Sequence, residues 1–97
     1  HREEDDGVLS GEVIHIDRFG NCITNIPAVL FADLSVPHTA AIPGRDKPLP
    51  LRGTYADVKR GDALALAGSM GRIEIAVRNG NAAELLGLRR GDPVRIV

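Results

Sequence analysis

Two polar bends in this sequence carry residue types that can form a binding site for a small molecule. The first, Asp17-Arg18-Phe19-Gly20-Asn21, places a carboxylate, an aromatic ring and an amide around a glycine that tolerates a sharp turn. The second, Gly68-Ser69-Met70-Gly71, offers a hydroxyl and backbone N–H groups that can hold an anionic group. Either bend alone is equally well explained as a turn, but two in one small chain indicate a common ligand.

Short strands are expected to position the first bend. Residues 8–17 alternate apolar and polar side chains, which predicts a strand with one face in a core. Residues 22–26 should pair with it as a hairpin, and Pro27 should end that ladder because proline has no N–H to donate. Residues 28–34 then predict a short helix or helical turn with its apolar residues facing inward.

The second half of the chain is rich in turn signals. The prolines in residues 36–51 favour two short edge strands around a mobile turn. Residues 58–64 and 88–94 share one pattern, in which a basic pair and Gly-Asp make a tight turn before an apolar strand. Residues 81–87 predict a helix with Asn as its N-cap and Gly as its stop. Periodicity alone therefore predicts a small β-barrel or sandwich and disfavours a parallel α/β sheet.

Composition limits the possible partners. The chain has 97 residues, a length that suits one domain. We expect residues 1–6 to be a flexible linker or an artificial chain edge, and residues 7–97 to be the folded part. Thirteen acidic and twelve basic residues leave no basic surplus for binding nucleic acid or a membrane surface. The aromatic residues are only three, so the core must consist of aliphatic side chains.

The sequence offers little support for metal or thiol chemistry. Asp62, Asp92, His15 and His38 are isolated from one another, so no metal site is expected. Cys22 is the only cysteine and lies in an apolar run, which favours a small buried residue over a catalytic thiol. An unpaired thiol, with no signal peptide and no membrane-spanning run, predicts a soluble cytoplasmic fragment.

Four blocks, in order, carry a resemblance to a known family. They are residues 16–26 with the pattern Ile-Asp-x-Phe-Gly-Asn-x-x-Thr-Asn-Ile, the Tyr-x-Asp-Val of residues 55–58, the strand-like segment that starts at Ser69, and the alanine-rich helix start. Together they resemble the C-terminal domain of the S-adenosyl-L-methionine (SAM) hydroxide adenosyltransferases, the SAM hydrolases related to bacterial fluorinating and chlorinating enzymes. The resemblance extends over nearly the whole chain from Gly7, and it implies an all-β, Greek-key β-barrel with one or two short helices.

The resemblance also implies how SAM would be bound. Asp17 would accept from the ligand's ammonium group, Asn21 would pair with the adenine edge, and Ser69 with the N–H groups of Met70 and Gly71 would hold the carboxylate. Three departures from the family pattern affect ligand preference: Gly68 replaces a polar residue, Met70 occupies a variable position, and an arginine at position 78 stands where asparagine is usual.

Aromatic and backbone groups would complete the pocket. Phe19 and Tyr55 match aromatics that line the ribose and adenine, and Arg78 and Asn79 match positions that contact adenine mainly through the backbone. The full set of implied substrate-binding residues is Asp17, Phe19, Asn21, Tyr55, Ser69, Met70, Arg78 and Asn79.

The implied reaction is attack of water or hydroxide on the ribose carbon that bears the sulfonium, which releases methionine and adenosine without a cofactor. The family's catalytic residues belong to an N-terminal domain, which would come from a neighbouring subunit of a homotrimer. This chain would supply no catalytic residue and should be inactive alone. The alternatives are a non-catalytic interaction or oligomerisation barrel, the same domain of a SAM-dependent halogenase, and an oligonucleotide-binding barrel, which the neutral charge and scarce aromatics disfavour.

Overall fold

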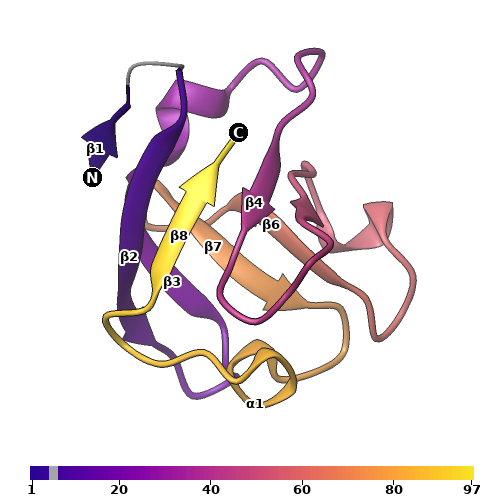
Figure 1. The fold of residues 1–97 in the computed structure, drawn as a ribbon. Coiled ribbons are helices and arrows are strands. Elements are labelled where there is room, and N and C mark those ends of the chain that lie inside the picture. The colour runs from indigo at the N-terminus through magenta and orange to yellow at the C-terminus, as the bar shows by residue number, and fades with distance from the viewer. Residues whose placement is uncertain (5–6) are drawn as a thin grey trace.

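The computed structural model describes residues 1–4 and 7–97, and its strands form one sheet that curls into a nearly closed barrel (Figure 1). The strands are β1 (Arg2–Glu3), β2 (Leu9–Ile16), β3 (Cys22–Pro27), β4 (Thr39–Ala41), β5 (Leu49–Pro50), β6 (Ala63–Ala67), β7 (Arg72–Val77) and β8 (Pro93–Ile96). The order of β2 to β8 is β5-β4-β8-β2-β3-β7-β6, β1 pairs with β2 off this path, and every pairing between the strands is antiparallel. A bridge from Leu51 to Ala65 joins the two ends of this order. The prediction of an all-β barrel with short helical pieces is confirmed.

Alternate residues of the central strands face the inside of the barrel. Val13, Ile26, Ile75 and Val94 are fully buried there, as the period of two along a strand requires. Thr24 is a polar member of this interior, and its hydroxyl is satisfied because it donates to the carbonyl oxygen of Ile73 at 2.7 Å. The core is thus made of aliphatic side chains, as the composition predicts.

A second, smaller apolar cluster lies outside the barrel. It consists of Leu64, Leu66 and Ala76, with Val58 packed against them. These positions alternate with the inward-facing residues of β6 and β7, so they occupy the outer face of the two strands. The segment before β6 therefore covers this outer face, which is where the candidate site lies.

The predicted hairpin is confirmed, and the segment after it is partly as predicted. Strand β3 ends at Pro27, and a 3-10 helix, η1 (Ala28–Phe31), follows. Ala28 and Phe31 are buried, but the expectation that all apolar residues of this segment face inward is wrong, because Val29, Leu30 and Leu34 are exposed. A 3-10 helix has three residues per turn, so Ala28 and Phe31 share the inner face of η1 and the two residues between them face outward, while Leu34 lies beyond its end.

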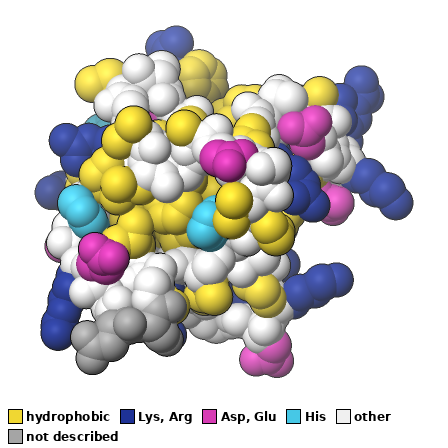
Figure 2. All heavy atoms as spheres, turned by 90° about the horizontal axis from the view of Figure 1, so that it is seen from above, with side chains coloured by type: hydrophobic (Ala, Val, Ile, Leu, Met, Phe, Trp, Pro, Cys, Tyr) yellow, Lys and Arg dark blue, Asp and Glu magenta, His cyan; other side chains and the backbone are white. Residues whose placement is uncertain are grey.

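The exposed residues of η1 belong to an apolar end of the molecule. Figure 2 views the molecule from above, and hydrophobic side chains gather around the middle of this view. A groove of about 300 Å³ lies beside η1, with Phe31, Leu34, Leu51 and Ile73 among its lining residues. This end of the barrel is therefore an apolar surface with a shallow hollow.

The proline-rich stretch forms strands at a position that was not predicted. Strands β4 and β5 pair with each other, as expected, but β4 also pairs with β8 and is therefore not an edge strand. Proline cannot donate to a ladder, and none of the residues of β4 is a proline, so nothing prevents its second pairing. The sequence of this stretch does not reveal β8 as the partner, because β8 lies more than fifty residues away.

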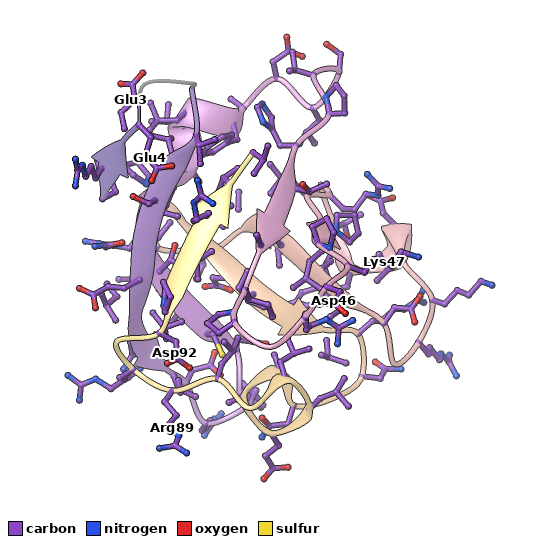
Figure 3. The ribbon with its side chains drawn as sticks, viewed as in Figure 1. Glu3, Glu4, Asp46, Lys47, Arg89 and Asp92 are labelled. Atoms are coloured by element: carbon purple, nitrogen blue, oxygen red, sulfur yellow. The ribbon has the colours of Figure 1, made fainter. Side chains whose placement is uncertain are left out.

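The repeated Gly-Asp turns are confirmed. Gly61 and Gly91 both have positive φ angles, +85° and +91°, and each turn leads into a strand, β6 or β8. In the second turn the Asp92 carboxylate accepts from the N–H of Arg89 at 2.9 Å, and Figure 3 shows both residues on the connection before β8. The local pattern of basic pair, glycine and aspartate is thus sufficient to define these turns.

The first residues of the chain contact the sheet. Arg2 and Glu3 form β1, which pairs with the start of β2, and Glu4 forms an ion pair with Arg95 at 2.7 Å. These contacts fall where the sequence predicted a linker, and residues 5–6 of that predicted linker lie outside the described residues. Within the described part of the chain, no helix has both the length and the apolar character needed to cross a membrane.

Candidate functional site

The first polar bend is organised by the side chain of Asp17. One carboxylate oxygen of Asp17 accepts from the backbone N–H groups of Phe19 and Asn21, at 2.9 and 3.0 Å. The other oxygen accepts from the side-chain amide of Asn21 at 3.2 Å. Asp17 therefore fixes both the loop and the orientation of the Asn21 amide, as aspartate often does in tight turns.

A short helix holds this loop from the other side. Helix α1 (Ala82–Leu86) has Asn81 as its N-cap, whose side chain accepts from the N–H of Glu84 at 3.0 Å, and Gly87 ends it in the left-handed conformation. The predicted helix and both of its caps are thus confirmed. The carbonyl oxygen of Gly20 accepts from the N–H of Ala83 at 2.9 Å. Gly20 has a φ of +84°, and a Cβ atom on it would overlap the Asn81 side chain, so the contact requires glycine.

Tyr55 lies near the same loop but comes from a different part of the chain. It begins the 3-10 helix η2 (Tyr55–Asp57), which is closed by a reciprocal capping box between Thr54 and Asp57. Arg78 secures the end of this segment, because its guanidinium donates to the carbonyl oxygen of Val58 at 2.7 Å. The Tyr55 segment is therefore tied to the end of β7.

Five of the predicted site residues line one open depression of about 680 Å³ on the outside of the barrel. They come from three separate parts of the chain and are Phe19, Asn21, Tyr55, Arg78 and Asn79. Phe19 is 62% exposed, with the Arg18 guanidinium 4.8 Å from its ring centroid. An exposed aromatic ring beside an anchored amide provides a stacking surface and a hydrogen-bonding edge for a planar, polar ligand.

The backbone groups near Arg78 differ in their availability. The N–H of Arg78 donates to the carbonyl oxygen of Asp62, and the carbonyl oxygen of Arg78 accepts from the N–H of Gly61 at 2.8 Å. These two groups are therefore already used within the protein. Asn79, which has a positive φ of +59°, is the predicted residue whose backbone can serve a ligand at this wall.

The second polar bend lies at the opposite end of β7. Ser69 and Met70 do not line the depression, and Met70 is 74% exposed. The N–H of Gly71 donates to the carbonyl oxygen of Gly68 at 3.1 Å, which closes the turn. Of the groups predicted to bind a carboxylate, the Ser69 hydroxyl and the Met70 N–H thus remain available.

Glu74 lies on the outer face of β7 and was not predicted as a site residue. Burial, followed by the charge of Asp17, raises the pKa of this carboxyl group above its usual value. Burial also raises the pKa of Tyr55, with further contributions from the charges of Glu74 and Asp17, while a hydrogen bond with Asn21 opposes them. The three side chains therefore belong to one electrostatic environment. The available sequence signal was a glutamate inside the apolar run of residues 73–77.

The thiol of Cys22 lies inside the barrel, which confirms its interpretation as a buried structural residue. Burial raises its pKa to about 11, with smaller contributions from Asp17 and Asp92, so it is a poor nucleophile near neutral pH. Within residues 1–4 and 7–97, no group of three histidine, cysteine or acidic side chains is arranged to hold a metal ion.

Comparison with known proteins identifies the family. The model of the SAM hydroxide adenosyltransferase C-terminal domain matches residues 11–95. The chain belongs to this family. A protein of Thermus thermophilus named (R)-S-adenosyl-L-methionine hydrolase is 39% identical to the domain over 87 residues, which are 90% of this chain and 31% of that protein. A protein of Salinispora tropica with the same name is 33% identical over 95 residues, which are 98% of this chain and 34% of that protein.

Solved structures agree with this assignment. A conserved uncharacterized protein from Thermotoga maritima superposes on the domain with a TM-score of 0.78 at 34% identity, over 90% of this chain and 34% of that one. A conserved hypothetical protein from Thermus thermophilus gives a TM-score of 0.75 at 40% identity, over 91% of this chain and 34% of that one. The domain thus spans about a third of the length of the relatives that it matches.

Proposed function

We propose that this chain is the substrate-binding C-terminal part of an enzyme that hydrolyses SAM to adenosine and L-methionine. The observation that carries the proposal is the depression in which Phe19, Asn21 and Tyr55 meet residues 78–80. Family membership and the printed names of the relatives supply the substrate. We use the term parent protein for a chain of the relatives' length that contains this domain.

The depression suits the adenosine part of SAM. Asn21 donates one amide hydrogen to Asp17 and its side chain also forms a hydrogen bond with Tyr55, which leaves at least one lone pair of the amide oxygen for an adenine edge. Tyr55 and the exposed ring of Phe19 can flank the purine and the ribose. The amino acid end of SAM would then extend along the outer face of β7 toward Ser69.

Catalysis is assigned to a different domain. Hydrolysis has a neutral thioether as its leaving group, so an enzyme mainly has to align and partly desolvate the water or hydroxide. We assign that task to the N-terminal domain of a neighbouring subunit in a homotrimer. The exposed side chains of Val29 and Leu30 in η1 supply apolar surface that such a domain could cover. The unpaired Cys22 supports a cytoplasmic location.

Product analysis tests this function. The parent protein, incubated with SAM, should release adenosine and methionine in equal amounts, and chloride or fluoride should not divert the product. A halogenated adenosine would show the halogenase alternative to be correct, and absence of any SAM turnover or binding would favour an interaction barrel. The isolated 97-residue chain should release no adenosine, and release by that chain would overturn the division of labour between domains.

Affinity provides a second test. The isolated domain leaves much of the ligand in water, so it should bind SAM with a millimolar dissociation constant or without detectable heat. Micromolar binding in calorimetry would show that the domain is a complete receptor by itself.

A further inference from the structure

A hollow of about 450 Å³ on the surface of the domain gathers positive charge. It is lined by residues of β5, of the connection before β5 and of the segment that leads into β6. Three of its side chains are cationic, Arg45, Lys47 and Arg52, and Asp62 is anionic. We call it the cationic hollow. It shares no lining residue with the depression that we assign to SAM, and it is positive in a chain whose formal net charge is −1.

The fold brings these cations together from both sides of β5. Arg45 and Lys47 belong to the connection between β4 and β5, on which Figure 3 labels Lys47. Arg52 follows β5, and its backbone N–H donates to the carbonyl oxygen of Ala65 in β6 at 2.9 Å. Thr39 in β4 adds a hydroxyl group to the lining. The sheet therefore fixes where Thr39 and Arg52 start, and the connection places the other two cations beside them.

The cations of the hollow are not neutralised by neighbouring carboxylates. Among the residues that the structure describes, the side chains of Arg45 and Lys47 form no hydrogen bond or ion pair, even though Asp46 lies between them in the sequence. The Arg52 guanidinium donates to the carbonyl oxygen of Leu51 at 3.5 Å, which is a long and weak bond. Most of the N–H donors of the three side chains therefore remain available to a ligand.

Asp62 differs from its counterpart in the second Gly-Asp turn. The Asp92 carboxylate accepts from the N–H of Arg89 and so stabilises its own turn. In the first turn the backbone N–H of Asp62 donates to the carbonyl oxygen of Lys59 at 3.0 Å, and the Asp62 carboxylate accepts no hydrogen bond from a described residue. The carboxylate of Asp62 is therefore not needed to close the turn, and it reduces the positive charge of the hollow.

We propose that the cationic hollow binds a small anion that carries a phosphoryl group. Guanidinium groups present paired N–H donors that match the oxygens of a phosphate, and an ammonium group adds a further charge. Three cations against one carboxylate leave a formal charge of +2 in the lining. A phosphate monoester carries a charge of about −1.5 to −2 at neutral pH, so the two charges are complementary. The proposal goes beyond SAM hydrolysis and does not depend on it.

The apolar part of the hollow suits an organic phosphate. Pro48, Pro50 and Val58 line it beside the cations. A site that combines apolar walls with a few charged groups is typical for small molecules that have an apolar body and a polar end. A phosphate ester should therefore gain contacts in the hollow that the free phosphate ion does not make.

Calorimetry on the parent protein tests the proposal with two probes, inorganic phosphate and phenyl phosphate. The measurements are made at one low ionic strength, because salt screens exposed charges. Each probe should bind at one site per chain, and saturation with S-adenosyl-L-homocysteine should not displace it. Tighter binding of phenyl phosphate would identify a phosphate ester as the ligand class, whereas equal binding would identify the free ion, and both results support the site. Displacement by S-adenosyl-L-homocysteine would place the probe in the other depression and overturn the proposal.

Charge variants of the hollow should act in opposite directions. Arg45→Gln and Arg52→Gln should each weaken the binding of phenyl phosphate roughly three- to tenfold. Asp62→Asn should strengthen it, because this change removes the carboxylate of the hollow. Arg90→Gln is the matched control, since it removes the same charge from an exposed arginine outside the hollow and should leave the affinity unchanged. Thermal unfolding of each variant checks that the fold is retained.

Three outcomes would overturn the proposal. The first is the absence of saturable binding of either probe. The second is equal weakening by Arg90→Gln and Arg52→Gln, which would show attraction to the surface as a whole. The third is weaker binding after Asp62→Asn, because loss of a negative charge must favour an anion in this hollow. None of these outcomes bears on the proposed function, which is tested separately by SAM turnover.

Discussion

Replacing Gly20 with alanine should destabilise the domain through two separable effects. The backbone of Gly20 has a φ of +84°, where a residue with a Cβ atom is less stable by about 1 to 2 kcal/mol. The new Cβ atom would also overlap the Asn81 side chain, and loss of that helix cap costs about 1 kcal/mol. The expected total is about 2 to 3 kcal/mol, which corresponds to a decrease in Tm of roughly 10 to 20 °C for a domain of this size.

Gly61→Ala is the matched control for this prediction. Gly61 has nearly the same φ, +85°, but a Cβ atom there would have no other atom within 4 Å. Its replacement should therefore show only the backbone effect, about 1 to 2 kcal/mol. Urea unfolding of both variants measures the difference. Equal losses of unfolding free energy would refute the reasoning that Asn81 and helix α1 hold the loop that carries Asn21.

Three further predictions concern the buried thiol, the buried carboxylate and the ligand-binding amide. Burial raises the pKa of the Cys22 thiol to about 11, so the thiol should resist a disulfide reagent at neutral pH in the folded domain and react fully when urea unfolds it. Rapid labelling of the folded domain would contradict the burial of Cys22. The pKa of Glu74 is raised in the folded state, so its contribution favours folding below its ordinary value of 4.5 and is lost as pH rises through the raised value. Glu74→Gln should consequently raise the unfolding free energy at pH 7, and a loss of stability at pH 7 would show that folding stabilises the charged form of Glu74. Asn21→Ala and Ser69→Ala should each weaken substrate capture by the parent protein, measured as kcat/KM, by about 1 to 3 kcal/mol with little change in Tm. A normal kcat/KM with a lowered Tm would show that Asn21 and Ser69 are only turn residues.

The features that follow from local chemistry could be predicted from the sequence. The hairpin around residues 17–21, the capped helix after Asn81 and the two Gly-Asp turns all depend on residues within a few positions of one another. Their caps and left-handed glycines are decided by neighbouring side chains. The family resemblance then supplied the barrel, and the structure places five of the eight implied site residues on one depression.

The features that depend on long-range pairing could not be predicted in the same way. The burial of Glu74 arises because Gly68 and the Tyr55 segment lie beside β7, and an apolar strand pattern does not show what will cover its outer face. The inner position of β4 depends on β8, which is distant in sequence. The exposure of Val29 follows from 3-10 geometry in place of a longer helical turn. In each case the missing information was a partner segment or a helix type.

The central claim is that the depression between the Asp17 loop, η2 and the end of β7 binds the adenosine part of SAM. A crystal structure of the parent protein with bound S-adenosyl-L-homocysteine tests this claim most directly. The account predicts that the adenine edge lies within hydrogen-bonding distance of the Asn21 amide, with Phe19 and Tyr55 beside the nucleoside. Adenine bound elsewhere on the protein, with this depression left to solvent, would contradict it.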